Sequence, residues 1–180
     1  MLKLGKKIVV VGISAVGKST FSRKLAQKLD LPLTLMDSIM WKPGWVYVGD
    51  NETVRRLDEI SLQSEWIIEG YVNKEARKFI FERADSIIYL DYSPITSSWR
   101  YVKRWWKHRN DPRPELDGSP EKFSFKFLKL VWTKGEAISL DKYLKAVEPK
   151  NKIVILHSSK QAERFLVETV ALFHTDIKDI

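Results

Sequence analysis

The sequence predicts an α/β fold, in which a doubly wound, five-stranded parallel sheet is flanked by helices. Three observations support this prediction: short continuous apolar runs, helical periodicity between them, and a glycine-rich loop after the first run. The apolar runs lie at residues 4–11, 33–37, 66–70, 86–91 and 152–157. Because these runs are continuous rather than alternating, they are typical of parallel strands covered on both faces.

Helical periodicity follows the first run, precedes the third and follows the last. The first two stripes consist of Phe21, Leu25 and Leu29, and of Val54, Leu57 and Ile60. Each stripe places apolar side chains on one face of a helix, as packing against a sheet requires. After the last run, Ser158 and Gln161 have the spacing of a capping box, ahead of a helix that carries Phe165 and Leu166.

Residues 94–135 predict a helical insertion in a single domain that spans residues 1–180, the segment in which the resemblance described below implies a lid. Ser93 and Pro94 combine a helix cap with a proline at the first helical position, which predicts a helix through about residue 108. Residues 110–118 contain two prolines and a glycine without apolar periodicity, so we expect an exposed, mobile loop there.

A second lid helix is predicted after this loop. Ser119 and Pro120 repeat the cap and proline signal, and Phe123, Phe127 and Leu130 lie on one helical face after them. The glycine at position 135 would break this helix.

Charge is concentrated in the same segment. The chain has 31 Lys and Arg against 23 Asp and Glu, a formal net charge of +8. Residues 94–135 contain ten basic and four acidic residues, so they carry six of the eight net charges. This predicts a polyanionic partner, either a nucleotide or a nucleic acid. The lack of cysteine excludes disulfide and thiolate chemistry, and the lack of a long apolar run favours a cytoplasmic protein without a membrane partner.

The strongest functional signal is a phosphate-binding loop. Residues 12–19 read GISAVGKS and match G-x-x-x-x-G-K-[ST], with a strand before them and a helix after them. Glycines let successive backbone N–H groups point at phosphate oxygens, and the helix N-terminus adds its dipole. The alternative is a plain glycine turn with a solvated lysine. The residues expected to bind the nucleotide are Gly12, Ser14, Ala15, Val16, Gly17, Lys18, Ser19 and Thr20.

Catalysis at such a loop needs a metal ion and a base. Lys18 would neutralise the β- and γ-phosphates, and the Ser19 hydroxyl would ligate Mg²⁺. A second metal ligand is expected at a strand end, where Glu69 is favoured over Asp91. Asp37, at the predicted end of the second strand, could accept a proton from a substrate hydroxyl or could simply cap a turn.

Several motifs of this sequence together resemble those of a known family. GISAVGKS at 12–19, LMD at 35–37, WKPGW at 41–45 and WIIEG at 66–70 are similar to the adenylate-kinase-like P-loop proteins known as DNA topology modulation proteins. The basic helix with Arg100 and Arg104, RPE at 113–115 and the aromatic stretch at 123–132 also match. The resemblance covers residues 8 to about 135.

This resemblance implies a P-loop fold of the nucleoside-monophosphate-kinase type with ATP and Mg²⁺ as ligands. It also implies an acceptor site after the second strand and a lid that closes over the phosphates. Arginines of the lid would clamp the transferred group, and Arg100, Arg104 and Arg113 are the candidates, with Arg109 beside them. The alternative is that these arginines belong to a solvated basic helix.

The tryptophans allow two interpretations. Trp41 and Trp45 flank a Pro-Gly turn and could form the wall of an acceptor pocket, or close one end of the core. Trp99, Trp105 and Trp106 recur at helical spacing, so we expect them to pack in the core.

Two functions therefore remain. The first is an ATP-dependent kinase that phosphorylates a nucleotide-, nucleoside- or sugar-like acceptor. The second is a nucleotide-dependent, nucleic-acid-binding or regulatory protein that influences DNA topology, and weak non-specific nucleic-acid binding is expected in either case. The direction in which the basic residues point distinguishes them, because clamping arginines converge on the P-loop and a nucleic-acid surface faces outward.

Overall fold

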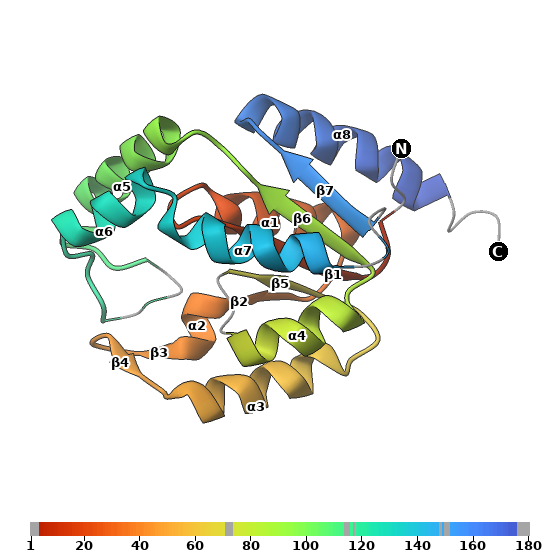
Figure 1. The fold of residues 1–180 in the computed structure, drawn as a ribbon, viewed down its shortest axis with the longest axis horizontal. Helices are drawn as coiled ribbons and strands as arrows, with labels where there is room; N and C mark the ends of the chain where they lie inside the picture. The colour runs from red at the N-terminus through yellow and green to blue at the C-terminus, as the bar shows by residue number, and fades with distance from the viewer. Residues whose placement is uncertain are drawn as a thin grey trace.

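The computed structural model describes residues 4–70, 74–113, 116, 118–147, 149 and 152–175. Its centre is a five-stranded sheet in the order β2-β5-β1-β6-β7, and every strand pair is parallel (Figure 1). The strands are β1 (Lys7–Gly12), β2 (Leu33–Leu35), β5 (Trp66–Glu69), β6 (Ser86–Leu90) and β7 (Ile153–Leu156). The predicted fold class is confirmed.

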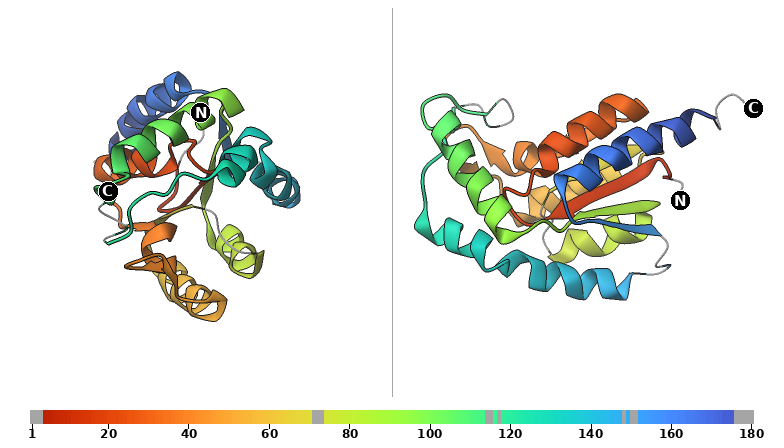
Figure 2. Two further views of the ribbon diagram at one scale, coloured as in Figure 1. Left: turned by 90° about the vertical axis from the view of Figure 1, so that its left-hand side faces the viewer. Right: turned by 90° about the horizontal axis from the view of Figure 1, so that it is seen from above.

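Helices cover both faces of this sheet (Figure 2). On β1, Ile8 and Val10 belong to one apolar cluster, whereas Val9 and Val11 belong to the other. Successive side chains of a strand point to opposite faces, so the continuous apolar run feeds two cores. The first cluster includes residues of α1 (Lys18–Leu29) and α8 (Ser159–Thr175), and the second includes residues of α3 (Asp50–Ser61), α4 (Lys74–Arg83) and α7 (Gly135–Ala146).

The second strand is shorter than predicted. β2 ends at Leu35, opposite Glu69, and Asp37 lies in the first turn of a short helix, α2 (Met36–Met40). The partner strand β5 ends at Glu69, and a side chain at the next residue, Gly70, would lie 2.6 Å from Met36 Cβ. The expectation of a strand through Asp37 is therefore wrong, because α2 packs against the end of β5 instead of extending the ladder.

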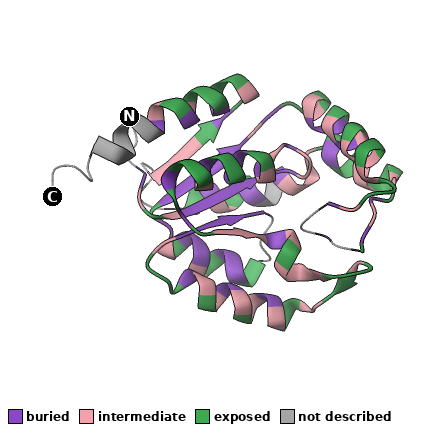
Figure 3. Ribbon diagram, turned by 180° about the vertical axis from the view of Figure 1, so that it is seen from behind, coloured by how far each residue is buried: buried purple, intermediate pink, exposed green. Residues whose placement is uncertain are grey.

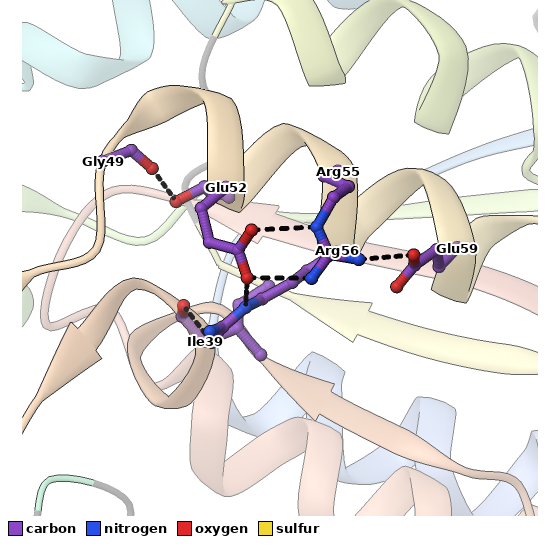
Figure 4. A network of polar contacts seen from close by, with 7 residues as sticks. Ile39, Gly49, Glu52, Arg55, Arg56 and Glu59 are labelled. Atoms are coloured by element: carbon purple, nitrogen blue, oxygen red, sulfur yellow. Dashed lines mark hydrogen bonds and ion pairs between the residues drawn. The ribbon is translucent and has the colours of Figure 1, made fainter.

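Helix α2 is held by its neighbour α3, and a two-stranded hairpin of β3 (Trp41–Lys42) and β4 (Val46–Tyr47) separates them. Arg56 Nη1 donates to the Ile39 carbonyl at 3.2 Å, and Glu52 binds both Arg55 (2.8 Å) and Arg56 (2.6 Å) (Figure 4). These two arginines lower the pKa of Glu52 to about 2. The network therefore fixes the position of the helix that carries Asp37.

Of the two helices predicted in residues 94–135, one begins as predicted and the other does not. Helix α5 (Pro94–His108) begins as predicted, with Thr96 N donating to Ser93 Oγ at 3.2 Å. The next helix, α6 (Phe125–Trp132), begins at the cap residue Ser124 and not at Ser119, so the predicted start is wrong. The Ser119 hydroxyl instead accepts a hydrogen bond from the backbone of the β3–β4 hairpin, which keeps the residues before α6 out of a helix.

The described part of residues 110–118 is only partly exposed. Asn110 and Asp111 are exposed, whereas Arg113 and Leu116 are 9% and 3% exposed, and Figure 3 colours the ribbon by this burial. Arg113 forms an ion pair with Asp37. The predicted exposed loop is therefore wrong for Arg113 and Leu116. The rest of the RPE motif lies outside the described residues.

The outer face of α5 is unexpectedly apolar. Ile95, Trp99 and Trp106 are 68%, 68% and 63% exposed, so the expectation that the last two pack in the core is wrong. The inner face instead carries the buried Tyr101 and the arginines that line a cavity. In the ranges that the structure describes, no helix has both the length and the apolar character to cross a membrane.

Candidate active site

The phosphate-binding loop connects β1 to α1 along a path that requires glycine. At Gly12, where φ is +153°, an added Cβ would lie 2.6 Å from the Leu90 carbonyl oxygen of the neighbouring strand. Gly17, with φ of +104°, precedes the first residue of α1 in the left-handed region. These two glycines allow the loop to turn tightly over the sheet edge, as the G-x-x-x-x-G spacing predicts.

Lys18 is turned into the loop. Its ammonium donates to the carbonyls of Gly12 (3.0 Å) and Ile13 (2.9 Å), and the residue is only 9% exposed. The ammonium charge of Lys18 is thus enclosed by the backbone of the phosphate-binding loop. The solvated lysine of the alternative interpretation does not describe this arrangement.

A cavity of about 1040 Å³ extends from this loop to α2 and the β3–β4 hairpin. Its volume lies at the upper end of the range for ligand pockets, which leaves room for more than one small molecule. The predicted site residues that line it are Ser14, Ala15, Gly17, Lys18, Ser19, Thr20, Asp37, Glu69, Arg100, Arg104 and Arg113. Gly12 and Val16 do not line it, because Gly12 ends β1 and the Val16 side chain packs in the core.

The end of β5 supplies a buried carboxylate beside the loop. Glu69 is 5% exposed, and its burial raises the pKa of the carboxyl, while the charge of Lys18 and a hydrogen bond with Ser19 oppose that effect. Ser19 and Glu69 together offer the oxygen donors that Mg²⁺ prefers, so the residues present fit this ion. The alternative ligand, Asp91, does not line the cavity: it pairs with Lys134 at 2.6 Å and lies 3.5 Å from His157.

The cavity is also lined by a cluster of two arginines and two carboxylates. Arg113 Nη1 lies 3.1 Å from Oδ2 of Asp37, whose side chain is 45% exposed. Nε of Arg113 and Nε of Arg104 lie 2.9 and 3.1 Å from the same oxygen of Glu121, which is buried. These contacts to Glu121 are ion pairs without good hydrogen-bond geometry. Burial lowers the pKa of the Arg104 guanidinium, and Glu121 opposes this.

Arg100 and Arg109 have different surroundings. Arg100 lies against the P-loop, where it donates to the Val16 carbonyl and to Ser159 Oγ at 2.8 Å. Arg109 is stacked on the Trp106 ring, 3.9 Å from its centroid, and does not line the cavity. The two arginines at positions 100 and 104 therefore share one helix face, as their spacing predicts, and contact different parts of the site.

The two tryptophans of the hairpin also line the cavity. The rings of Trp41 and Trp45 meet edge to face, 5.6 Å apart. Trp45 has a φ of +63°, a conformation that a bulky residue rarely adopts, and both its nitrogens are bound to the lid: N to Ser119 Oγ (3.1 Å) and Nε1 to the Pro120 carbonyl (3.0 Å).

Two acidic residues of the site were not anticipated. Glu121 was counted only as one of four acids in the basic segment. Glu136, in the first turn of α7, binds Ser14 of the P-loop through both carboxylate oxygens. No pattern in the sequence links positions 122 residues apart, so only the fold reveals this contact.

Comparison with known proteins supports the fold. No family model and no curated protein matches this chain. Among solved structures, shikimate kinase from Bacteroides thetaiotaomicron has a TM-score of 0.56 at 16% identity, over 93% of this chain and 97% of that one. Shikimate kinase from Aquifex aeolicus VF5 has a TM-score of 0.54 at 15% identity (94% and 97% covered), and gluconokinase from Sinorhizobium meliloti 1021 one of 0.52 at 15% (96% and 94%).

These similarities define the class of fold. The chain has the P-loop fold of the nucleoside-monophosphate-kinase type that these small-molecule kinases share.

Proposed function

We propose that this protein is a P-loop phosphotransferase that binds MgATP and transfers its γ-phosphoryl group to a small-molecule acceptor. The observation that carries the proposal is that one cavity is lined both by the P-loop and by the ion pair of Asp37 and Arg113. The fold shared with shikimate kinase and gluconokinase supports the same class of reaction.

The chemistry follows from what the residues can do. The acceptor hydroxyl would bind near Asp37, which accepts its proton as the new bond between acceptor oxygen and γ-phosphorus forms. The bond between the γ-phosphorus and the bridging oxygen breaks, and ADP leaves. An acceptor phosphate would need no base, because its oxygen is already ionised. Cationic side chains stabilise the charge that spreads over the transferred group.

Each basic residue has a distinct part in this proposal. Lys18 and the loop N–H groups bind the phosphate chain, and Arg100 supports the loop from α5. Arg104 and Arg113 hold the acceptor end, where Glu121 keeps their guanidinium groups together. When bound, Mg²⁺ would neutralise the phosphate oxygens, and Ser19 and Glu69 are the residues that would hold it.

The acceptor is proposed to be nucleotide-, nucleoside- or sugar-like. The edge-to-face pair of Trp41 and Trp45 offers an apolar wall for a ring, and Asp37 and Arg113 offer polar partners for its substituents. This combination of a mostly apolar wall and a few convergent polar groups is typical of small-ligand pockets.

A screen for ADP release tests the proposal. Purified protein is incubated with MgATP and single members of a panel of nucleotides, nucleosides and sugars, and phosphate transfer is verified on the acceptor with γ-labelled ATP. We expect ADP release that depends on one class of acceptor and is absent from Lys18→Met. Release that is independent of every acceptor would identify an ATPase, and no MgATP binding would contradict the P-loop assignment.

A second candidate is a nucleotide-dependent, nucleic-acid-binding or regulatory protein. The observation that favours it is exposure on two neighbouring helices: Lys103, Trp99 and Trp106 are exposed on α5, and Lys126 and Lys129 are exposed on α6. The sequence resemblance to DNA topology modulation proteins points in this direction as well. We rank it second, because Arg100, Arg104 and Arg113 turn inward.

A further inference from the structure

Glu136 places a carboxylate on the phosphate-binding loop. Its Oε2 accepts a hydrogen bond from the backbone N–H of Ser14 at 2.6 Å, and its Oε1 accepts one from Ser14 Oγ at 2.9 Å. Ser14 lies inside the G-x-x-x-x-G-K-S sequence and lines the cavity. Backbone N–H groups of such a loop form an anion-binding concavity, so a carboxylate oxygen is bound here as a phosphate oxygen would be.

Among the described residues, no lysine or arginine forms a salt bridge with the Glu136 carboxylate. Its two hydrogen bonds there are both with Ser14, and Lys134 pairs with Asp91 instead. Lys18, the nearest cation of the motif, donates to Gly12 and Ile13 instead. The P-loop is therefore the partner that neutralises this charge.

The neighbouring residues fix Glu136 at this position. Lys134 precedes α7 with a φ of +49°, a strained value for a residue other than glycine, and its ammonium pairs with Asp91 at 2.6 Å. Asp91 follows β6, whose last residue Leu90 lies beside Gly12 of β1. The junction between α6 and α7 is thus attached to the sheet next to the P-loop, which places the first turn of α7 against Ser14.

We propose that Glu136 is a specificity-determining residue for the nucleotide, because its carboxylate holds Ser14 until the phosphate chain of the ligand replaces it. This inference rests on the proposed nucleotide binding. A ligand gains the Ser14 N–H only by displacing the carboxylate, and before that it meets a negative charge at the loop. Both effects weaken the binding of phosphates and leave the binding of an uncharged nucleoside unchanged.

The consequence is a graded selection by charge. The apparent dissociation constant of a ligand rises with the fraction of molecules in which its site is occupied by another group. Removing the carboxylate therefore strengthens binding most for the ligand with the most phosphates. Displacement also releases the first turn of α7 from the loop, so phosphate binding and the position of α7 are coupled.

Calorimetric titration of the whole chain with adenosine, AMP, ADP and MgATP tests this inference. In Glu136→Gln we expect MgATP to bind on the order of tenfold more tightly than in the unaltered chain, the effect of one charge-assisted contact. The gain should be smaller for AMP and absent for adenosine. Glu59→Gln, which removes an exposed carboxylate of α3 far from the loop, is the matched charge control and should leave all four affinities unchanged.

Hydrogen exchange supplies a second readout. We expect MgATP, but not adenosine, to increase exchange of the amides in the first turn of α7 in the unaltered chain. Weaker MgATP binding in Glu136→Gln would overturn the inference, because it would show that Glu136 supports the loop while nucleotide is bound. An equal gain in affinity for adenosine would also overturn it. If the unaltered chain binds MgATP and Glu136→Gln does not differ from it, only this inference falls. If neither binds MgATP, the proposed function falls with it.

Discussion

Lys18 shows how a single charged residue can be held ready for a ligand. It is buried, and its ammonium donates to the carbonyls of Gly12 and Ile13, where the loop leaves β1, while its charge acts on the Glu69 carboxyl. We predict that Lys18→Met lowers MgATP affinity by at least about tenfold, since hydrogen bonds to charged groups contribute about 1.5–3 kcal/mol. Isothermal titration measures the affinity, and unchanged affinity with unchanged turnover would contradict the P-loop assignment.

Glu69 leads to a prediction about pH and stability. Burial raises the pKa of its carboxyl above the unfolded value, so the folded chain binds more protons than the unfolded chain in that pH range. The free energy of unfolding contributed by this group therefore falls as pH rises from the unfolded pKa through the folded one. We predict that Glu69→Gln raises the melting temperature at neutral pH, by about 2–4 °C for each kcal/mol regained.

The same substitution should weaken metal-dependent nucleotide binding, because an amide is a poorer Mg²⁺ ligand than a carboxylate. Thermal unfolding at pH 5 and pH 7.5, with and without MgATP, separates the two effects. A lower melting temperature for Glu69→Gln at pH 7.5 without nucleotide would show that the carboxylate stabilises the fold.

At the residue scale, the sequence predicts local motifs and misses distant partners. The P-loop could be read directly, because its glycines, Lys18 and Ser19 are adjacent in the chain and act through local backbone geometry. Glu121 and Glu136 could not, because their partners are brought to them by the sheet order and by α5. Asp37 and Arg113 are 76 positions apart in the chain. The sequence indicates each of them as a candidate site residue, but not their contact with each other.

At the scale of elements, α5 separates its arginines by function. Arg104 faces the cavity and Glu121, whereas Arg109 is stacked on Trp106 outside it. We predict that Arg104→Met lowers kcat by about 10²-fold or more and changes MgATP affinity little, because the proposed function places its guanidinium at the transferred group. Arg109→Met is the matched control and should leave both quantities unchanged.

Steady-state kinetics and nucleotide titration of both variants check this prediction. Equal losses in the two variants would indicate that the arginines act only through the general basicity of α5. Loss of MgATP affinity without loss of kcat would place Arg104 at the nucleotide and away from the acceptor.

The β3–β4 hairpin connects the proposed acceptor site to the segment before α6. Trp45 donates through its indole to the Pro120 carbonyl, two residues after Gly118 and one before Glu121. We predict that Trp45→Phe raises the acceptor KM and lowers the free energy of unfolding by about 0.5–1.5 kcal/mol, the contribution of one hydrogen bond. Trp99→Phe removes an indole from an exposed site and is the control. An unchanged acceptor KM in Trp45→Phe would separate the hairpin from the acceptor site.

Elements with long periodic stripes were predictable, and short ones were not. The strands, α1, α3 and α5 follow from apolar runs, helical stripes and the Ser93 cap. Helix α2 and the two strands of the hairpin have five and two residues each, too few to show a period. The start of α6 was misplaced because Ser119 and Ser124 are both good caps, and a tertiary contact with Trp45 decides between them.

At the scale of the whole molecule, the basic segment divides into two groups. Arg100, Arg104, Lys107, Arg113 and Lys122 line the cavity, and Lys134 pairs with Asp91. Four exposed residues remain that neither line the cavity nor form an ion pair with the sheet edge: Lys103, Arg109, Lys126 and Lys129. About half of the basic residues that suggest a polyanionic partner in the sequence therefore line the candidate active site.

This division predicts how the chain binds nucleic acid. Contacts with about four phosphates give a logarithmic salt dependence near −3.6, so affinity for duplex DNA should fall by roughly 10²-fold between 50 and 200 mM salt. MgATP binding should change far less, because it relies on backbone N–H groups and a coordinated metal. Fluorescence anisotropy with labelled DNA and calorimetry with MgATP measure the two dependences on the same preparation.

A double variant, Lys103→Gln with Lys126→Gln, separates the two sites. We predict that it halves the salt slope for DNA, because two of the four phosphate contacts are gone, and leaves MgATP affinity unchanged. The exposed Trp99 and Trp106 can still stack on unpaired bases, so single strands should lose less affinity than duplexes. DNA binding that resists salt and strengthens with MgATP would reverse the ranking of the two functions, since it would require the nucleotide site to act on the outer face of α5.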